Sequence, residues 1–170
     1  EKFLKKFKIN FKNNKNMDFI KHHIDKYDGK MPIWVAVEIF TMGMLYNFYI
    51  NLPTTNQKKI AKEFNTGVNQ LKSWIENITY LRNITAHYAR IYSYRTQKTP
   101  VICKYNHKDY KATNYVFDII LVMKFLSLNK SDWNDYIINN IYALIEQYKE
   151  YIDLKCIGFP ENWKEILIKK

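Results

Sequence analysis

Arg82, Asn83 and His87 are the residues of this 170-residue chain whose types and spacing are best suited to chemistry. Imidazole is the side chain that most readily gives and takes protons near neutral pH. The planar guanidinium group of arginine can bind two phosphate oxygens at once through two parallel hydrogen bonds. RNA carries its own nucleophile, the 2′-hydroxyl, so proton transfer and cationic stabilisation of the phosphorane are enough to cleave it. These side chains are therefore suited to cutting RNA without a metal.

The basic charge of the chain is concentrated in two segments, and one of them contains these residues. The formal net charge is +11, of which residues 82–111 contribute +6 and residues 1–30 contribute +5. The only arginines, Arg82, Arg90 and Arg95, fall within 14 residues of one another. This clustering predicts a phosphate-binding surface. Its expected RNA-binding residues are Arg90, Arg95, Tyr88, Tyr94 and Lys98.

The segment that carries the cluster reads as one long helix over residues 68–94. Leu71, Trp74, Ile75, Ile78, Leu81, Thr85 and Tyr88 then form its core face, and the opposite face carries Asn83, His87, Arg90 and Tyr94. Arg82 and His87 are five residues apart, so they lie about 140° apart around an ideal helix.

Arg82 falls on the flank of the apolar face of that helix, where its guanidinium must find a partner or reach out along the surface. Glu38 poses the corresponding problem, because it lies in an otherwise apolar segment. We expect the two side chains to be close in space, with Glu38 supporting and orienting Arg82.

The rest of the chain predicts an all-α bundle in a single domain, residues 1–170, with a basic arm at 1–16 and the bundle at 17–168. No convincing strand pattern is present, and Gly and Pro number four each. Thr54 with Gln57 resembles a capping box, and Ser131 is an expected helix cap. The four tryptophans are expected in the core. Helices are expected over residues 17–27, 32–51, 54–65, 68–94, 113–128 and 131–151, followed by a short helix at the C-terminal end.

Metal, cofactor and membrane functions find no support in the sequence. His22, His23, Cys103, His107 and Cys156 do not have the spacing of a zinc site, and Cys103 with His107 makes a weak nucleophile pair. No glycine-rich phosphate loop is present. The most apolar stretch, residues 34–50, is shorter than the roughly 20 residues that a membrane span needs. We expect a soluble, cytoplasmic protein that requires no metal or cofactor.

The stretch from Arg82-Asn83 to His87 matches the Arg-(four residues)-His motif of HEPN domains, including the Asn that these domains prefer after the Arg. Further segments resemble the Abi-like family of bacterial abortive-infection proteins, of the AbiD/AbiF type. The matching segments are residues 31–43, which contain a Pro-x-Trp…Glu…Phe-Thr-x-Gly pattern, residues 81–95, and the Gly-Phe-Pro…Trp pattern at 157–163. The resemblance covers residues 17–168 in the expected order.

The resemblance implies a HEPN-like bundle and an RNase effector in antiphage defence or a toxin. It assigns Arg82 to the scissile phosphate, His87 to proton transfer and Asn83 to positioning. It also implies a homodimer with a composite cleft, and a neutralising RNA or protein partner. Some HEPN toxins have a Tyr two residues after the His, where this chain has Ala89.

Two alternatives remain open from the sequence. The chain could be a catalytically silent HEPN module that holds a regulatory RNA or partner. It could also be a purely structural bundle, which would require Arg82, Arg90 and Arg95 to be buried in internal ion pairs.

Overall fold

The computed structural model describes residues 2–102 and 110–169, and within these ranges the chain is all-helical with no strand. The all-α prediction is therefore confirmed for this part of the chain. The elements are α1 (Lys2–Asn13), α2 (Asp18–Tyr27), α3 (Ile33–Ala36), η1 (Val37–Ile39), α4 (Met42–Ile50), α5 (Thr54–Glu63), α6 (Val68–Ala86), α7 (Val116–Leu126), the π-helical η2 (Asp132–Ile138), α8 (Asn139–Tyr148), η3 (Leu154–Ile157) and α9 (Trp163–Leu167).

The chain divides into two compact units, Glu1–Gln57 and Lys58–Lys170. Each unit has buried apolar residues of its own, and each is described by itself below. This division concerns packing within the units, and the single-domain assignment stays a prediction.

The first unit begins with a helix, α1, where the sequence predicts a basic arm. Phe3 and Phe7 lie one turn apart on α1, so both rings pack on the same neighbour, Phe40, with centroids 5.3 and 6.0 Å away. The Asn10 amide donates to the Ile39 carbonyl at 3.0 Å. Lysines lie between these positions, so the segment is amphipathic although it is rich in Lys. Burial of its phenylalanine face stabilises the helix.

The expected helix over 32–51 is wrong, because the chain breaks at Phe40 and Thr41. Phe40 has extended backbone (ψ 135°) and ends η1. Thr41 caps α4, since its Oγ1 accepts the Met44 N–H at 3.2 Å. The cap is not evident in the sequence, because the apolar run continues through both helices. Periodicity cannot distinguish one long helix from two short ones with the same buried face.

The expected capping box at Thr54 does not form either. The first turn of α5 instead bonds back to Pro53, whose carbonyl accepts the N–H groups of Asn56 and Gln57. The Gln57 amide is buried and donates to the carbonyls of Ile50 and Leu52, at 3.0 and 2.8 Å. It therefore caps the end of α4 rather than the start of its own helix.

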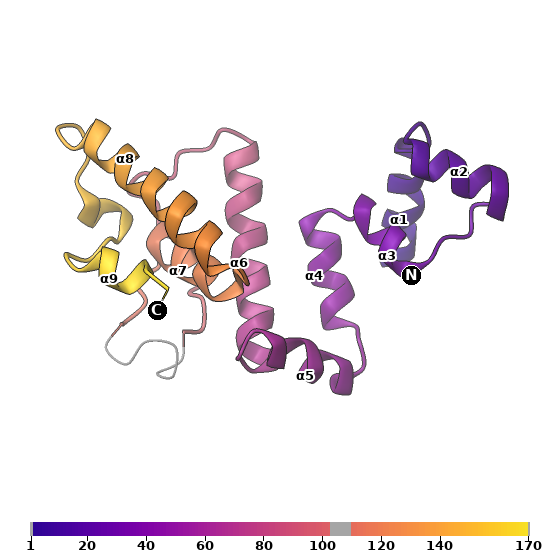
Figure 1. Ribbon diagram of the computed structural model, residues 1–170, viewed down its shortest axis with the longest axis horizontal. Helices are drawn as coiled ribbons and strands as arrows, with labels where there is room; N and C mark the ends of the chain where they lie inside the picture. Colours follow the sequence, from indigo (N-terminus) through magenta and orange to yellow (C-terminus); the bar gives the residue numbers. More distant parts are fainter. Residues whose placement is uncertain (1, 103–109, 170) are drawn as a thin grey trace. The chain divides into compact units, whose positions relative to one another are not determined.

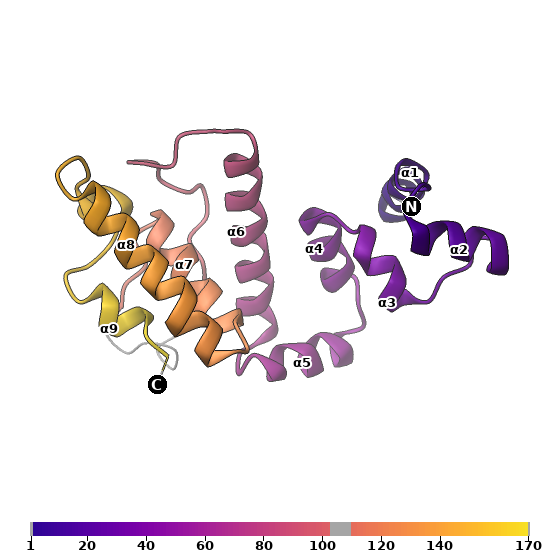
Figure 2. The same cartoon turned by 45° about the horizontal axis from the view of Figure 1, so that its top comes forward.

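The second unit is built around α7, which is buried almost all round. Figure 1 shows α8 lying across α7 with α9 nearby, and Figure 2 shows the same arrangement from a tilted direction. The Asn129 side chain, not Ser131, accepts the Asp132 N–H at the start of the π-helical segment. The buried cluster comprises Phe117, Leu121, Trp133, Ile138, Phe159, Trp163, Ile166 and Leu167.

The Gly-Phe-Pro…Trp segment has a structural role in this unit. Gly158 has φ 81°, and a Cβ there would lie 2.6 Å from the Cβ of Tyr115, so no other residue fits without displacement. The turn directs Phe159 and Trp163 into the core. Trp74, Trp133 and Trp163 are buried as expected, whereas Trp34 of the first unit is 72 % exposed, contrary to expectation.

Candidate functional site at the end of α6

The helix that carries the Arg–Asn…His cluster ends at the cluster itself. The N–H of Tyr88 donates to the carbonyl of Thr85, and the N–H of Ala89 donates to the carbonyl of Ile84, both at 3.0 Å. This pair of bonds is a Schellman motif, in which the residue after the C-cap takes a left-handed conformation. Tyr88 holds that position with φ 54°, and His87 is the C-cap. The imidazole therefore lies at the exposed C-terminal end of α6.

The prediction of one helix over 68–94 is therefore wrong beyond Ala86, and Arg90 and Tyr94 do not continue the stripe of Asn83 and His87. The buried face of α6 ends at Leu81, and every residue from Thr85 to Arg90 is exposed. Without further apolar burial, nothing compensates the cost of extending the helix.

Asn83 lies between Arg82 and His87 around the helix. At about 100° per residue, Asn83 is about 100° from Arg82, and His87 is about 40° further in the same direction. The Arg82 guanidinium Nη1 donates to Asn83 Oδ1 at 3.2 Å. This bond tilts the guanidinium toward the side of the helix on which His87 lies, which narrows the angular gap between the two side chains.

The segment after the helix returns along the same face of α6, toward its N-terminal end. The Tyr94 ring stacks on Tyr80, with centroids 6.4 Å apart, and the two hydroxyl groups are hydrogen-bonded. That bond raises the pKa of Tyr80. The Lys98 ammonium lies 2.5 Å from a Glu76 carboxylate oxygen. Tyr94 and Lys98 are thus brought to the face of Asn83 and His87, although by a folded-back chain rather than by a continuing helix.

A small pocket of about 220 Å³ lies between α6 and this returning segment. Its walls are Glu76, Asn77 and Tyr80 on one side and Gln97 and Lys98 on the other. Tyr80 and His87 are seven positions apart in the sequence, which is about 10 Å along the helix axis. The pocket combines one ring, two amides and a charged pair, which are the groups that read the edges of a base.

Residues that the sequence analysis did not single out hold the returning segment in place. Thr96 is buried, and its N–H donates to the carbonyl of Asn114 at 2.7 Å. The fully buried Asp118 carboxylate accepts the N–H groups of Thr113 and Asn114, at 2.8 and 2.7 Å, and the hydroxyl of Tyr110. Burial raises the pKa of this carboxyl, and the hydrogen bonds oppose the rise. The feature of the sequence that could have indicated this role is Asp118 itself, an acidic residue within the otherwise apolar run of α7.

The three arginines lie at the surface, and none of them forms an ion pair with another described residue. Arg90 Nε donates to the Tyr92 carbonyl at 3.0 Å, and Arg95 Nε donates to the Tyr115 hydroxyl at 3.1 Å. The Arg95 guanidinium carbon also lies 4.9 Å from the centre of the Tyr115 ring. Neither ion pair that the described residues form involves an arginine. A purely structural bundle would require the three arginines to be buried in internal ion pairs, and in the described part of the chain they are not.

Some predictions about the site stay open. Glu38 is exposed in η1 of the first unit, and its proximity to Arg82 in the second unit stays a prediction. Cys103 and His107 lie outside the described residues. Over the described residues, no group of three or more His, Cys, Asp or Glu side chains is arranged to hold a metal ion. In the same ranges, none of the helices has the length and apolar character needed to cross a bilayer.

Fold and site together define an all-helical protein with an exposed Arg–Asn…His cluster at the C-terminal end of a helix. A family model described as Abi-like protein matches residues 1–93, more than half of the sequence, and the chain belongs to this family. The match includes α1 to α6 and the cluster, and family membership indicates an abortive infection-type function. No curated protein and no solved structure matches the chain.

Proposed function

We propose that this Abi-like protein is a metal-independent endoribonuclease of the HEPN type that acts in abortive infection. The observation that carries the proposal is the arrangement of Arg82, Asn83 and His87 at an exposed helix end, with Asn83 directing the guanidinium toward the side of the imidazole. The arginine-rich segment that surrounds this cluster supports the proposal, because phosphate contacts dominate affinity for RNA.

In the proposed reaction, the 2′-hydroxyl of the substrate loses its proton and attacks the adjacent phosphorus. The bond from phosphorus to the 5′-oxygen breaks, and that oxygen takes up a proton, leaving a 2′,3′-cyclic phosphate and a 5′-hydroxyl. His87 would either accept the proton of the 2′-hydroxyl or donate the proton to the 5′-oxygen. Arg82 would stabilise the negative charge on the phosphorane oxygens, the kind of contact whose loss costs about 10²–10³ in rate.

A second copy of the chain would complete the site in this proposal. Arg82 and His87 project from different sides of one helix, so two facing α6 ends would bring an arginine and a histidine to the same phosphate. Arg90 and Arg95 would hold flanking phosphates. Tyr88, which is 98 % exposed, is free to stack on a base, and Tyr94 and Lys98 would border the base next to it.

A catalytically silent RNA-binding module is the second candidate, and one observation favours it. Within the described residues, no side chain is hydrogen-bonded to the His87 imidazole to orient it. Catalytic hydrogen bonds commonly form only in the substrate complex, so this observation does not exclude catalysis. In either case a neutralising RNA or protein partner is expected, and a chain of charge +11 attracts RNA.

The experiment that decides between the candidates compares the wild type with His87→Ala for cleavage of RNA in EDTA and for binding of the same RNA. If the protein is a nuclease, the wild type should give cyclic-phosphate products. The cleavage rate should fall by about 10²–10⁴-fold in His87→Ala, while both proteins bind the RNA with similar affinity. Equal binding without cleavage by either protein would favour the silent module. Cleavage that EDTA abolishes would contradict the metal-free mechanism.

A further inference from the structure

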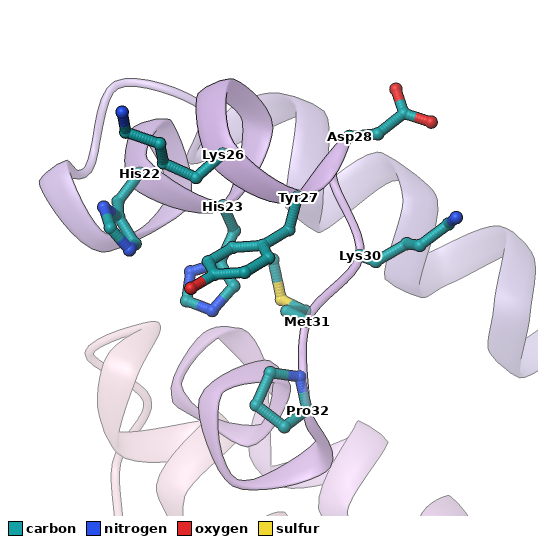
Figure 3. Close-up of a pocket in the computed structure, with 8 residues that line it drawn as sticks. All are labelled: His22, His23, Lys26, Tyr27, Asp28, Lys30, Met31 and Pro32. Atoms are coloured by element: carbon teal, nitrogen blue, oxygen red, sulfur yellow. The ribbon is translucent and has the colours of Figure 1, made fainter.

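The first unit contains a large open pocket that the Arg–Asn…His cluster does not use. It lies at the C-terminal end of α2, has a volume of about 760 Å³, and is lined by residues between positions 22 and 32 (Figure 3). This volume is within the range of about 300–1,000 Å³ that is typical of ligand sites.

One face of α2 forms the wall of this pocket. Ile20 and Tyr27 are seven residues apart and share that face, but Ile20 is fully buried whereas Tyr27 is 55 % exposed. The face that anchors the helix in the core therefore continues into an open aromatic surface. Asp28 and Gly29 both have positive φ, 53° and 71°, so the chain turns sharply after the helix. The turn brings Met31 beneath the Tyr27 ring, as Figure 3 shows.

Three rings cluster in the pocket. The centroids of His22, His23 and Tyr27 are 5.5 to 5.7 Å apart from one another. His23 Nδ1 lies 2.7 Å from the Phe19 carbonyl oxygen. A carbonyl only accepts, so Nδ1 carries the hydrogen, and Nε2 is an acceptor whenever the ring is neutral. The cluster therefore offers flat apolar faces together with a hydrogen-bond acceptor.

Two ammonium groups flank the rings. In Figure 3 the Lys26 and Lys30 side chains extend outward on opposite sides of the cluster, and the Asp28 carboxylate is directed away from the rings on the side of Lys30. Neither lysine takes part in the ion pairs that the described residues form. Aromatic faces bordered by cations are the arrangement that binds single-stranded nucleic acid, with bases stacked on the rings and phosphates beside the cations.

We infer that this pocket binds one nucleotide of a single-stranded RNA, with the base against the rings of Tyr27 and the two histidines and the neighbouring phosphates near Lys26 and Lys30. It is a second RNA contact, separate in sequence from the Arg–Asn…His cluster. The inference rests on the proposed function for the identity of the ligand, because the same chemistry also suits a free nucleotide. The pocket would hold a strand whether or not that strand is cut.

The test uses the full-length His87→Ala protein, which keeps the RNA intact, and a short oligouridine that contains 5-iodouridine. Light-induced crosslinks should map to residues 22–30. Tyr27→Ala should weaken binding of the oligomer about tenfold or more, and Tyr27→Phe, which keeps the ring, should not. Lys26→Gln should weaken binding several-fold and reduce the salt dependence by about one counterion.

Matched controls are available in the same chain. Lys21→Gln lies on α2 outside the pocket, and Tyr151→Ala removes an even more exposed tyrosine from the second unit; neither should change binding. Crosslinks confined to residues outside 22–30, or wild-type affinity in Tyr27→Ala, would overturn the inference. Tyr27-dependent binding of uridine monophosphate as tight as that of the oligomer would also overturn it, in favour of a free-nucleotide site.

The outcome is independent of whether the protein is a nuclease. If the wild type cleaves RNA in EDTA and the Tyr27→Ala variant binds and cleaves equally well, the pocket inference alone is wrong. If no RNA is cleaved but Tyr27→Ala loses binding and crosslinks, the pocket inference is supported and the nuclease proposal is not.

Discussion

Two sites can be compared: the pocket at the end of α2, lined by residues between 22 and 32 (the α2 pocket), and the Arg–Asn…His cluster with the segment that returns to it (the α6 site). Both lie where a helix ends at residues with positive φ, but they are assembled in different ways. The pocket uses one stretch of eleven residues, 22–32, and its turn bonds are local, such as those from the N–H groups of Asp28 and Gly29 to the His23 carbonyl. The α6 site combines the helix end with a segment that returns to it.

The returning segment depends on long-range bonds. The Trp74 indole donates to the Val101 carbonyl at 2.8 Å, Thr96 bonds to Asn114, and Asn114 in turn bonds to the buried Asp118. A site made of local bonds forms wherever its own helix is stable. A site held by distant bonds is lost when a buried group far from it is changed, so the two sites should respond differently to the same mutations.

The largest effect that separates the two sites is expected from Arg82→Lys. A lysine keeps the charge but loses the planar fork, so cleavage should fall by about 10²–10³-fold. Arg90→Lys is the matched control, because Arg90, whose Nε donates to the nearby Tyr92 carbonyl, is expected to hold a flanking phosphate; the change should mainly weaken binding. Crosslinking at residues 22–30 should not change in either variant. Wild-type rates for Arg82→Lys would remove the arginine from the proposed mechanism.

A large effect on stability is expected from Asp118→Ala. The substitution removes the buried carboxylate that accepts the partly buried N–H groups of Thr113 and Asn114 and the hydroxyl of Tyr110, at a cost of about 3 kcal/mol in the free energy of unfolding. Asp132→Ala, which removes an exposed acid from the first turn of η2, should cost only about 0.5 kcal/mol. Urea denaturation measures both values.

Hydrogen exchange in Asp118→Ala then sharpens the comparison. Exchange should increase in residues 91–101, which depend on the Asn114 bonds, and remain as in the wild type in residues 22–32. Equal increases in both segments would show that the two sites do not differ in the way proposed here.

A smaller effect is expected from Gly29→Ala in the turn that forms the pocket. The added Cβ would lie 3.6 Å from Phe11 Cζ, which is ordinary contact, so the cost comes from φ 71° and should be about 1–2 kcal/mol. Gly43→Ala is the opposite control, because Gly43 lies in α4 and a Cβ there would make only an ordinary contact, 4.0 Å from Thr41 Oγ1; it should stabilise by about 0.5–1 kcal/mol. Thermal denaturation distinguishes the two signs.

The sequence predicted the helical class and the positions of the helices with clear ends. The helix at 17–27 ends as expected at Asp28 and Gly29, and the apolar run at 113–128 contains α7. The breaks at Phe40 and Ala86 could not be predicted from periodicity, because the first depends on a threonine cap inside an apolar run. The second depends on where burial against α7 stops.

The roles of the candidate site residues stay a prediction, but their placement can be compared with the expected one. Arg82, Asn83 and His87 lie within the last two turns of α6, and Arg82 is hydrogen-bonded to Asn83. Tyr94 reaches the expected face of α6 by a different route, and Lys98, expected only as an RNA-binding residue, lies on the same face. That route depends on Thr96, Asn114 and Asp118, whose contacts link segments far apart in sequence. Periodicity along one helix carries no information about such contacts, so these residues were missed.

The smallest effect is expected at Tyr88, which holds a left-handed position where glycine is usual. Tyr88→Gly and Tyr88→Ala both remove the ring, so the difference between them isolates the backbone conformation. The glycine variant should be more stable than the alanine variant by about 1 kcal/mol, because alanine keeps the strain of φ 54°. Urea denaturation of the two variants measures this difference. Equal stability would show that the Schellman turn is not maintained in solution, and the imidazole of His87 would then not be fixed at a helix end as the α6 site requires.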